Sequence, residues 1–242
     1  MAAHPISSTM HMGSHQYASL YAHNSNVIQG NVYIDSQAES QAQKADTIVQ
    51  YGLCLTSAPV ISPEYFVGRD AELAQMKHIL QPGETATEQR RLVLGGMGGI
   101  GKTQLAIAYA RRHYASYASV FWLNATTDLS LRGSFGMIAQ GLLKAEELEN
   151  LETKQLVLRV HQWLANRRNT LWLLIFDNYD DQNQFKIDEY IPHAAHGSVI
   201  ITSRLPAQVT GQQLRVQPIR DLKDGLAILQ SRSERSGAAD GR

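Results

Sequence analysis

Cysteine, long apolar runs and net charge are all scarce in this sequence of 242 residues. Cys54 is the single cysteine, which excludes an internal disulfide and a multi-cysteine metal site and fits a reducing, cytoplasmic compartment. The longest strongly apolar run, residues 171–176, is far shorter than the roughly 20 residues that cross a bilayer, so we expect no membrane span. The N-terminus also lacks the apolar segment of a secretory signal.

Positive and negative side chains balance, with 22 Lys and Arg against 22 Asp and Glu. A chain without net charge is a poor general binder of nucleic acid, and we expect no nucleic-acid partner. Charged residues make up 18% of the chain, below the roughly 25% of average proteins, whereas the 43% of apolar residues can fill a core. The charge is missing mainly from residues 1–60, which contain four charged side chains.

Residues 1–60 keep neither a helical nor a strand period, so we expect a disordered polar leader that ends near the two prolines of residues 58–63. Within it, residues 25–34 are uncharged, rich in β-branched side chains and free of proline, as in segments that stack into amyloid. A plain polar linker and an amyloid-type segment both agree with this composition. A folded domain is expected over 61–235 and a disordered tail over 236–242.

Short apolar runs alternate with helical patterns after the prolines. This alternation predicts a three-layer α/β domain with a mainly parallel sheet. We expect helices that are capped by Asp70, Asp128 and Asp221, one that runs to about Ala115, and one that ends near Arg168. Strands are expected over 91–94, 119–124, 171–176, 198–202 and 214–216.

The first of these strands leads directly into residues 96–103, GMGGIGKT, which fit the phosphate-binding pattern G-x-x-x-x-G-K-[ST]. Glycines let backbone N–H groups point at phosphate oxygens, and the helix that follows adds the positive end of its dipole. Lys102 is expected to reach the β- and γ-phosphates, and Thr103 to offer its hydroxyl to Mg²⁺.

Polar residues follow two later strands in the same way. Asp177 ends the apolar strand, and a carboxylate there, beside a phosphate loop, is the Walker B arrangement that holds Mg²⁺. Arg204 follows the strand 198–202, and ligands bind at the carboxyl ends of parallel strands, so we expect it to contact a γ-phosphate. An ordinary strand-end turn and a solvated surface arginine are the plain alternatives.

Taken together, these residues resemble the NB-ARC class of STAND P-loop NTPases, the switch domain of NLR-type immune and cell-death receptors. The resemblance covers roughly residues 64–234, and the segment FDNYDD at 176–181 looks most like NLR-type proteins of filamentous fungi. Four ordered motifs carry it: YFVGRDAEL at 65–73, GGMGGIGKT at 95–103, SVFWLN at 119–124 and GSVIITSR at 197–204.

The resemblance implies a signalling switch of fungal innate immunity that binds ATP or ADP with Mg²⁺. It implies a segment over the adenine at 65–73, with roles for Val67 and Arg69, and γ-phosphate sensing by Arg204. The expected nucleotide-binding residues are Val67, Arg69, Gly96, Gly98, Gly99, Ile100, Gly101, Lys102, Thr103 and Gln104. The expected catalytic residues are Lys102, Asp177, Asp180, Asp181 and Arg204, and the expected metal ligands are Thr103 and Asp177.

Two features depart from the family pattern. Asn178 stands where many members have a second acidic residue that is proposed to activate water, so hydrolysis must use Asp180 or Asp181, or be very slow. The family continues into a helical lid, a winged-helix domain and repeats. This sequence ends one helix after its last expected strand, and we expect a fragment, an incomplete gene model or a truncated protein. That helix, with Leu222, Leu226 and Leu229, would favour self-association.

Three functions remain in competition at this point. The first is a switch that holds ADP at rest and exchanges it for ATP, which the segments around Arg69 and Arg204 favour. The second is a P-loop ATPase or kinase with continuous turnover. The third is a non-catalytic adaptor that recruits a partner effector through its N-terminal segment, since residues 27–33 resemble the HET-s-type amyloid motif of some fungal NLR proteins.

Overall fold

The computed structural model describes residue 66 and residues 68–81, 88–148 and 151–219, together with the backbone of Val27–Ile28 and Leu53–Cys54. The rest of the expected leader over 1–60, the side chains of its amyloid-type segment, the final helix from Asp221 and the expected tail over 236–242 lie outside these residues.

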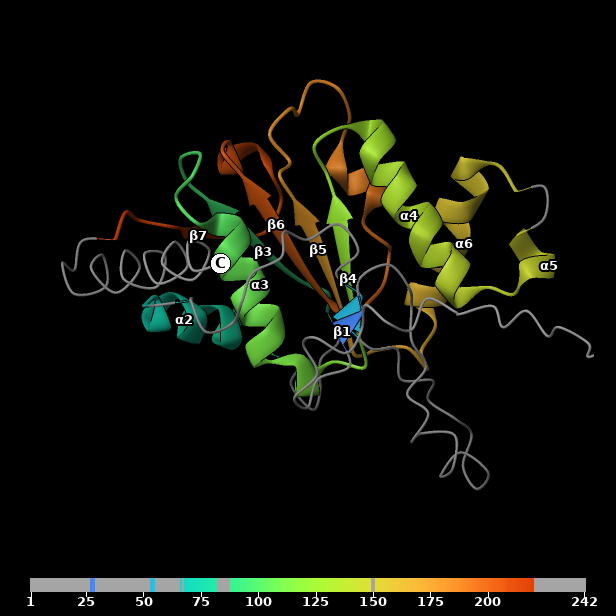
Figure 1. Ribbon diagram of the computed structural model, residues 1–242, viewed down its shortest axis with the longest axis horizontal. Coiled ribbons are helices and arrows are strands. Elements are labelled where there is room, and N and C mark those ends of the chain that lie inside the picture. The colour runs from blue at the N-terminus through green and yellow to red at the C-terminus, as the bar shows by residue number, and fades with distance from the viewer. Residues whose placement is uncertain are drawn as a thin grey trace, which may run out of the picture.

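A parallel β-sheet forms the middle layer of the fold (Figure 1). Its strand order is β1-β2-β4-β5-β6-β3-β7, and every neighbouring pair is parallel. The five longer strands are β3 (Arg90–Gly95), β4 (Ser119–Asn124), β5 (Trp172–Asp177), β6 (Ser198–Ser203) and β7 (Gln212–Arg215). The two-residue strands β1 (Val27–Ile28) and β2 (Leu53–Cys54) extend the sheet beside β4. The α/β fold with a mainly parallel sheet that the sequence predicts is confirmed.

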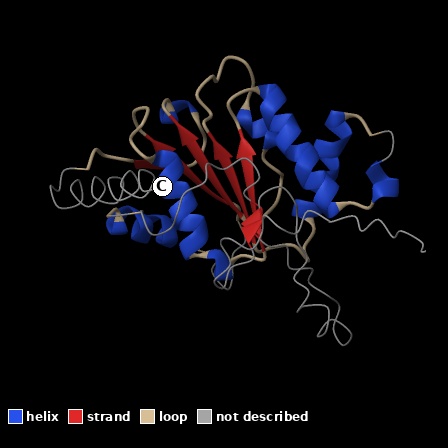
Figure 2. Cartoon of the chain, in the orientation of Figure 1, coloured by secondary structure: helices blue, strands red, loops and turns tan. Residues whose placement is uncertain are grey.

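Helices cover both faces of this sheet, as Figure 2 shows in blue against the red strands. One face is covered by α2 (Asp70–Leu80) and α3 (Lys102–Arg112), and the other by α4 (Asp128–Leu142) and α6 (Thr153–Ala165). The short helix α5 (Ala145–Leu148) links α4 to α6. The described residues also form the short 3₁₀ helices η3 (Tyr114–Ser116), η4 (Ile187–Tyr190) and η5 (Pro206–Gln208).

Successive side chains of each central strand enter two separate hydrophobic cores. In β5, Leu173 and Ile175 pack in the core under α2 and α3, whereas Leu174 and Phe176 pack in the core under α4 and α6. Successive residues of a strand point to opposite faces, so a strand that is covered on both sides has no face that is open to solvent. The uninterrupted apolar run in the sequence therefore reflects a central position in the sheet.

Four helix ends differ from the expectation, and one of them is the end of α6, which lies at Ala165 and not near Arg168. Arg69, in the left-handed conformation with φ 64°, takes the N-cap position of α2 and makes no side-chain cap, so Asp70 is the first helical residue. Thr127 caps α4, because its hydroxyl oxygen accepts a hydrogen bond from the backbone N–H of Ser130 (3.1 Å), and Asp128 follows it. Helix α3 ends at Arg112 because the chain then tightens into η3.

The strand order determines which loops meet. Strand β6 lies between β3 and β5, so the loop after β3, Asp177 at the end of β5 and Arg204 after β6 all emerge at one edge of the sheet. Carboxyl ends of parallel strands are the usual position for ligands in such sheets. The sequence separates these groups by many residues, and the sheet brings them together.

We expect Gly197→Ala to destabilise the fold, because a Cβ at this position would lie 2.2 Å from the buried ring of Trp172 and the backbone has φ 83°. Overpacking and left-handed strain together predict a loss of about 2–5 kcal/mol. Gly133→Ala is the matched control, since nothing lies within 4 Å of its Cβ position on the exposed side of α4. It should gain about 0.5–1 kcal/mol. Urea unfolding measures both, and a shift in the same direction for the two variants would contradict this packing.

Candidate functional site

The loop between β3 and α3 carries the phosphate-binding pattern. Gly99 (φ 74°) and Gly101 (φ 98°) adopt left-handed conformations that suit glycine, and Gly101 is the N-cap of α3. Gly101 has no side chain to cap the helix, so the first N–H groups of α3 stay available for an external acceptor. The loop thus combines exposed donors with the positive end of a helix dipole, an arrangement that suits an anion.

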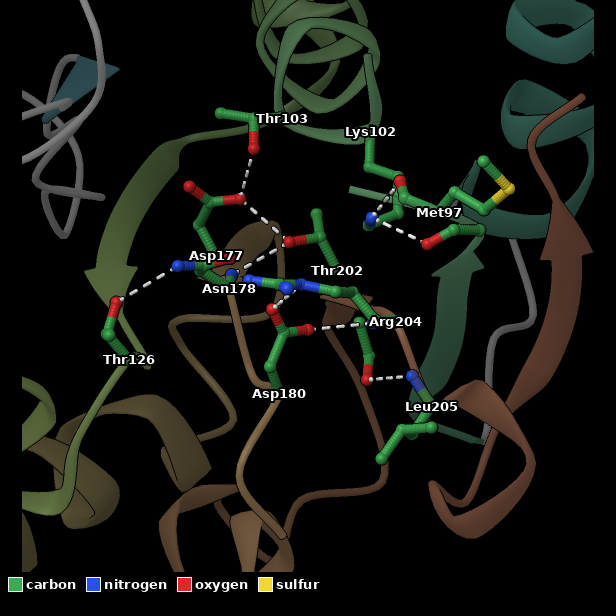
Figure 3. A network of polar contacts seen from close by, with 12 residues as sticks. Met97, Lys102, Thr103, Thr126, Asp177, Asn178, Asp180, Thr202, Arg204 and Leu205 are labelled. Carbon is green, nitrogen blue, oxygen red and sulfur yellow. Dashed lines mark hydrogen bonds and ion pairs between the residues drawn. The ribbon is translucent and has the colours of Figure 1, made fainter. Parts of the chain in front are cut away.

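Lys102 is the first residue of α3 and is 9% exposed. Its ammonium group donates to the carbonyl oxygens of Gly96 (2.8 Å) and Met97 (3.0 Å), so the side chain is folded against the loop (Figure 3). Burial lowers the pKa of Lys102, an effect that the nearby carboxylate of Asp180 opposes and the guanidinium of Arg204 reinforces. The cation therefore lies next to the loop, where its hydrogen bonds are to neutral carbonyl oxygens.

Asp177, at the end of β5, joins three elements. Its Oδ1 accepts hydrogen bonds from the hydroxyls of Thr103 on α3 (2.8 Å) and Thr202 on β6 (2.7 Å). The hydroxyl oxygen of Thr202 in turn accepts from the backbone N–H of Asn178 (2.8 Å). Burial raises the pKa of Asp177, while the hydrogen bonds from Thr202 and Thr103 and the charge of Lys102 act in the opposite direction.

Thr103 and Asp177 have the chemistry that a magnesium ion requires. The Thr103 hydroxyl oxygen and the Asp177 carboxylate oxygen lie 2.8 Å apart, and Mg²⁺ prefers oxygen ligands, commonly one or two carboxylates completed by water and phosphate. In the described part of the chain no group of three His, Cys, Asp or Glu residues could hold a metal by itself. A metal at this position would therefore need ligands from water and from a phosphate-bearing partner.

Arg204 and Asp180 form an ion pair at the same edge (Figure 3). Asp180 accepts from the backbone N–H of Arg204 through Oδ1 (2.7 Å) and from its Nε through Oδ2 (2.6 Å). The guanidinium lies about 4 Å from the position that a Cβ of Gly98 would take, which places it beside the phosphate loop. Asp181 makes its hydrogen bonds within its own loop, to Gln184 (2.7 Å) and to the backbone N–H of Asn183 (3.3 Å).

The sequence profile of the NB-ARC domain matches residues 70–220, a span that contains the phosphate loop, Asp177 and Arg204. The chain belongs to the NB-ARC family of P-loop NTPase domains. It is 28% identical over 181 residues to a nucleotide-binding leucine-rich repeat (NLR)-like protein of the fungus Hyaloscypha variabilis. The alignment covers 68% of this chain and 18% of that relative, so the chain spans less than a fifth of the relative's length.

Solved structures resemble this NB-ARC domain in fold. The ORC2 protein of Aeropyrum pernix, solved as ADPNP–ADP complexes, superposes with a TM-score of 0.50 at 15% identity, covering 71% of this chain and 55% of that one. Cdc6p of Pyrobaculum aerophilum gives a TM-score of 0.49 at 14% identity, covering 72% and 54%. In the described residues of the NB-ARC domain no helix is long and apolar enough to cross a membrane.

Arg69 contacts the NB-ARC phosphate loop from outside. Its NH2 donates to the carbonyl of Ile100 (2.8 Å), and its NH1 donates to Glu72 (2.9 Å) and to the carbonyl of Gln217 (3.0 Å). The side chain is 7% exposed, so these protein contacts hold the guanidinium in place. The hydrogen bonds of Arg69 thereby connect the phosphate loop with the segment after β7.

The remaining expected binding residues are placed as follows. Gly96 opens the loop, Ile100 packs against the core under α2 and α3, and Gln104 is a half-buried residue in the first turn of α3. Val67 lies outside the described residues. The structure thus brings the described loop residues together with Asp177, Asp180 and Arg204, whereas Asp181 contacts its own loop.

Two residues that sequence reasoning missed hold the site together. Thr202 bonds to Asp177 from the neighbouring strand, and Thr126 accepts from the side-chain amide of Asn178 (3.3 Å). Asn178 itself has φ 69°, a left-handed conformation that asparagine tolerates better than most residues. A hydroxyl at the end of β6 is a weak signal in the sequence, because only the pairing of β5 with β6 reveals its partner.

We expect Asp177→Asn to stabilise the metal-free protein at neutral pH. Because burial raises the pKa of Asp177 in the folded state, its contribution to stability is full below the ordinary carboxyl pKa and falls as the pH rises through the folded pKa. Asparagine keeps an oxygen that accepts from Thr103 and Thr202 and carries no charge. The urea midpoint, measured with a chelator present, should rise at neutral pH, and the gain should shrink in acid. An unchanged or lower midpoint at neutral pH would contradict this electrostatic account.

Proposed function

We propose that this NB-ARC domain is a nucleotide-dependent switch that binds ADP and ATP at the loop of residues 96–103. The observation that carries the proposal is the convergence of Lys102, Asp177 and Arg204 around that loop. Three unlike groups, on α3, at the end of β5 and after β6, would serve three parts of one ligand: a cation for phosphate, oxygens for Mg²⁺ and a guanidinium for the terminal phosphate.

Each group has a distinct role in the proposed complex. The N–H groups of the loop and of the first turn of α3 bind phosphate oxygens, and Lys102 exchanges the carbonyls of Gly96 and Met97 for the β- and γ-phosphates. Thr103 and Asp177 hold Mg²⁺, which when bound neutralises part of the charge on the phosphates. Arg204 contacts the γ-phosphate, which distinguishes ATP from ADP.

Slow hydrolysis separates a switch from an enzyme with continuous turnover. Asn178 is an amide and cannot take a proton from water at neutral pH. Asp180 uses both carboxylate oxygens for Arg204, and Asp181 bonds within its own loop. The residue next to Asp177 therefore supplies no base for water, which favours slow hydrolysis and a long-lived ATP state.

The family and the relative support a proposal for the wider role. The Hyaloscypha protein is NLR-like, and we extend this to a switch within a larger NLR-like signalling protein of fungal immunity. In this proposal the nucleotide state controls self-association or the exposure of an N-terminal effector segment. An adaptor that acts without nucleotide is the competing function, and nucleotide binding decides between the two.

Lys102→Ala should weaken both ADP and ATP, because it removes the cation next to the phosphate loop. A charge-assisted hydrogen bond contributes about 1.5–3 kcal/mol, or roughly one to two decades in affinity. Lys144→Ala, at an exposed position after α4, is the charge-matched control and should bind as the parent does. Calorimetry measures all three proteins. A folded Lys102→Ala variant with parental affinity for both nucleotides would refute the proposed site.

Steady-state phosphate release should lie far below 1 s⁻¹, which is about the low end of ordinary enzymes. The physical reason is that Asn178, an amide next to Asp177, cannot act as the general base. The assay uses monodisperse protein with ATP and Mg²⁺, and Lys102→Ala supplies the blank. Turnover near or above that rate, lost in Lys102→Ala, would instead establish a P-loop ATPase with continuous turnover.

A further inference from the structure

The ion pair between Asp180 and Arg204 has a consequence for the choice between nucleotides. The geometry points to Asp180 as an internal competitor of the γ-phosphate: its carboxylate binds the same guanidinium and thereby lowers the preference of the site for ATP over ADP. This inference rests on the proposed function, and it makes Asp180 a positioning residue that acts through Arg204.

Asp180 binds Arg204 through two hydrogen bonds. Both carboxylate oxygens of Asp180 bond to Arg204, one to its backbone N–H at 2.7 Å and the other to Nε at 2.6 Å. The backbone contact fixes the carboxylate at the end of β6 whatever the side chain of Arg204 does. The side-chain contact then holds the guanidinium on the carboxylate.

The guanidinium is already next to the place where phosphate would bind. Its Nε, Cζ and NH1 lie 3.9, 4.0 and 4.0 Å from the Cβ position of Gly98, a residue without a side chain in the middle of the phosphate loop. Lys102, the loop cation, is close enough for both charges of the ion pair to affect its pKa, Asp180 upwards and Arg204 downwards. A γ-phosphate on this loop would therefore meet Arg204 while Asp180 still binds it.

The exposure of the two side chains makes an exchange feasible. The Arg204 side chain is 60% exposed, whereas that of Asp180 is 21% exposed and is also held by the backbone N–H. Exposed ion pairs are weak because water screens them, so a phosphate bound among fixed N–H donors can displace the carboxylate. ADP has no γ-phosphate and leaves the pair intact. ATP must break it, which reduces its net affinity.

The experiment compares Asp180→Asn with Asp181→Asn in the full chain, using calorimetry with Mg²⁺ and either ADP or a non-hydrolysable ATP analogue. Asparagine at 180 retains an oxygen for the backbone N–H of Arg204 and loses the charge that holds Nε. We expect the affinity for the ATP analogue to rise about two- to fivefold, the change an exposed ion pair typically carries, with ADP unchanged. Asp181→Asn removes the same charge one residue later, where no contact with Arg204 exists, and should leave both affinities unchanged.

A second pair of variants separates competition from simple repulsion between Asp180 and the γ-phosphate. Arg204→Ala should weaken the ATP analogue by roughly one to two decades and ADP much less. In this background Asp180→Asn should no longer change the ratio of ATP to ADP affinity, because there is no guanidinium to release. A gain that persists or grows without Arg204 would overturn the inference in favour of repulsion.

Two further outcomes keep the inference separate from the proposed function. In the first outcome, Lys102→Ala abolishes nucleotide binding, while Asp180→Asn and Asp181→Asn have the same ratio of ATP to ADP affinity as the parent protein. The proposed site then stands and the role of Asp180 is refuted. If Lys102→Ala binds as the parent does, the proposed site itself fails. Thermal unfolding checks each variant, and Asp180→Ala, expected to shift the ratio in the same direction, replaces Asp180→Asn if the latter does not fold.

Discussion

The buried carboxylate of Asp177 is the contact on which the geometry of the site depends. Through one oxygen it accepts from Thr103 at the start of α3 and from Thr202 on β6, and its own backbone ends β5. The phosphate loop, the oxygens of Thr103 and Asp177 and the strand that leads to Arg204 are thereby held at fixed positions relative to one another. Burial of this charge costs stability, as the raised pKa of Asp177 indicates, and the two hydroxyl donors offset part of that cost.

The two cations of the site are held by acceptors within the protein. Lys102 donates to two loop carbonyls, and Arg204 donates to the carboxylate of Asp180. When a phosphate ligand binds, these two cations would thus exchange hydrogen bonds to the protein for hydrogen bonds to the phosphate. An exchange of this kind makes the net affinity sensitive to small changes in the competing acceptors, which suits the nucleotide-dependent switch that we propose.

Many features of the fold follow from sequence pattern alone. The run 171–176 predicts a strand that is covered on both faces, and residues 172–176 lie in the middle of the sheet with alternate side chains in two cores, whereas Leu171 precedes β5 and is exposed. The phosphate loop is equally local, since strand, glycines and helix follow one another in the chain. The helix caps were predicted less well: Arg69 and Thr127, not Asp70 and Asp128, occupy the N-cap positions, because capping depends on backbone conformation as well as on residue type.

The features of the site that the sequence did not predict are contacts between residues that are far apart in the chain. The sequence alone determined the fold class, the phosphate loop and the strand-end positions of Asp177 and Arg204, because these follow from local periodicity and from the common edge of parallel strands. Only the tertiary structure decided that Asp180 rather than Asp181 binds Arg204, 24 residues away, and that Arg69 bonds to Gln217, 148 residues away. Such pairs depend on the order of the strands and on the direction of each side chain at the end of a turn. Neither property is encoded in the spacing of residues along the chain.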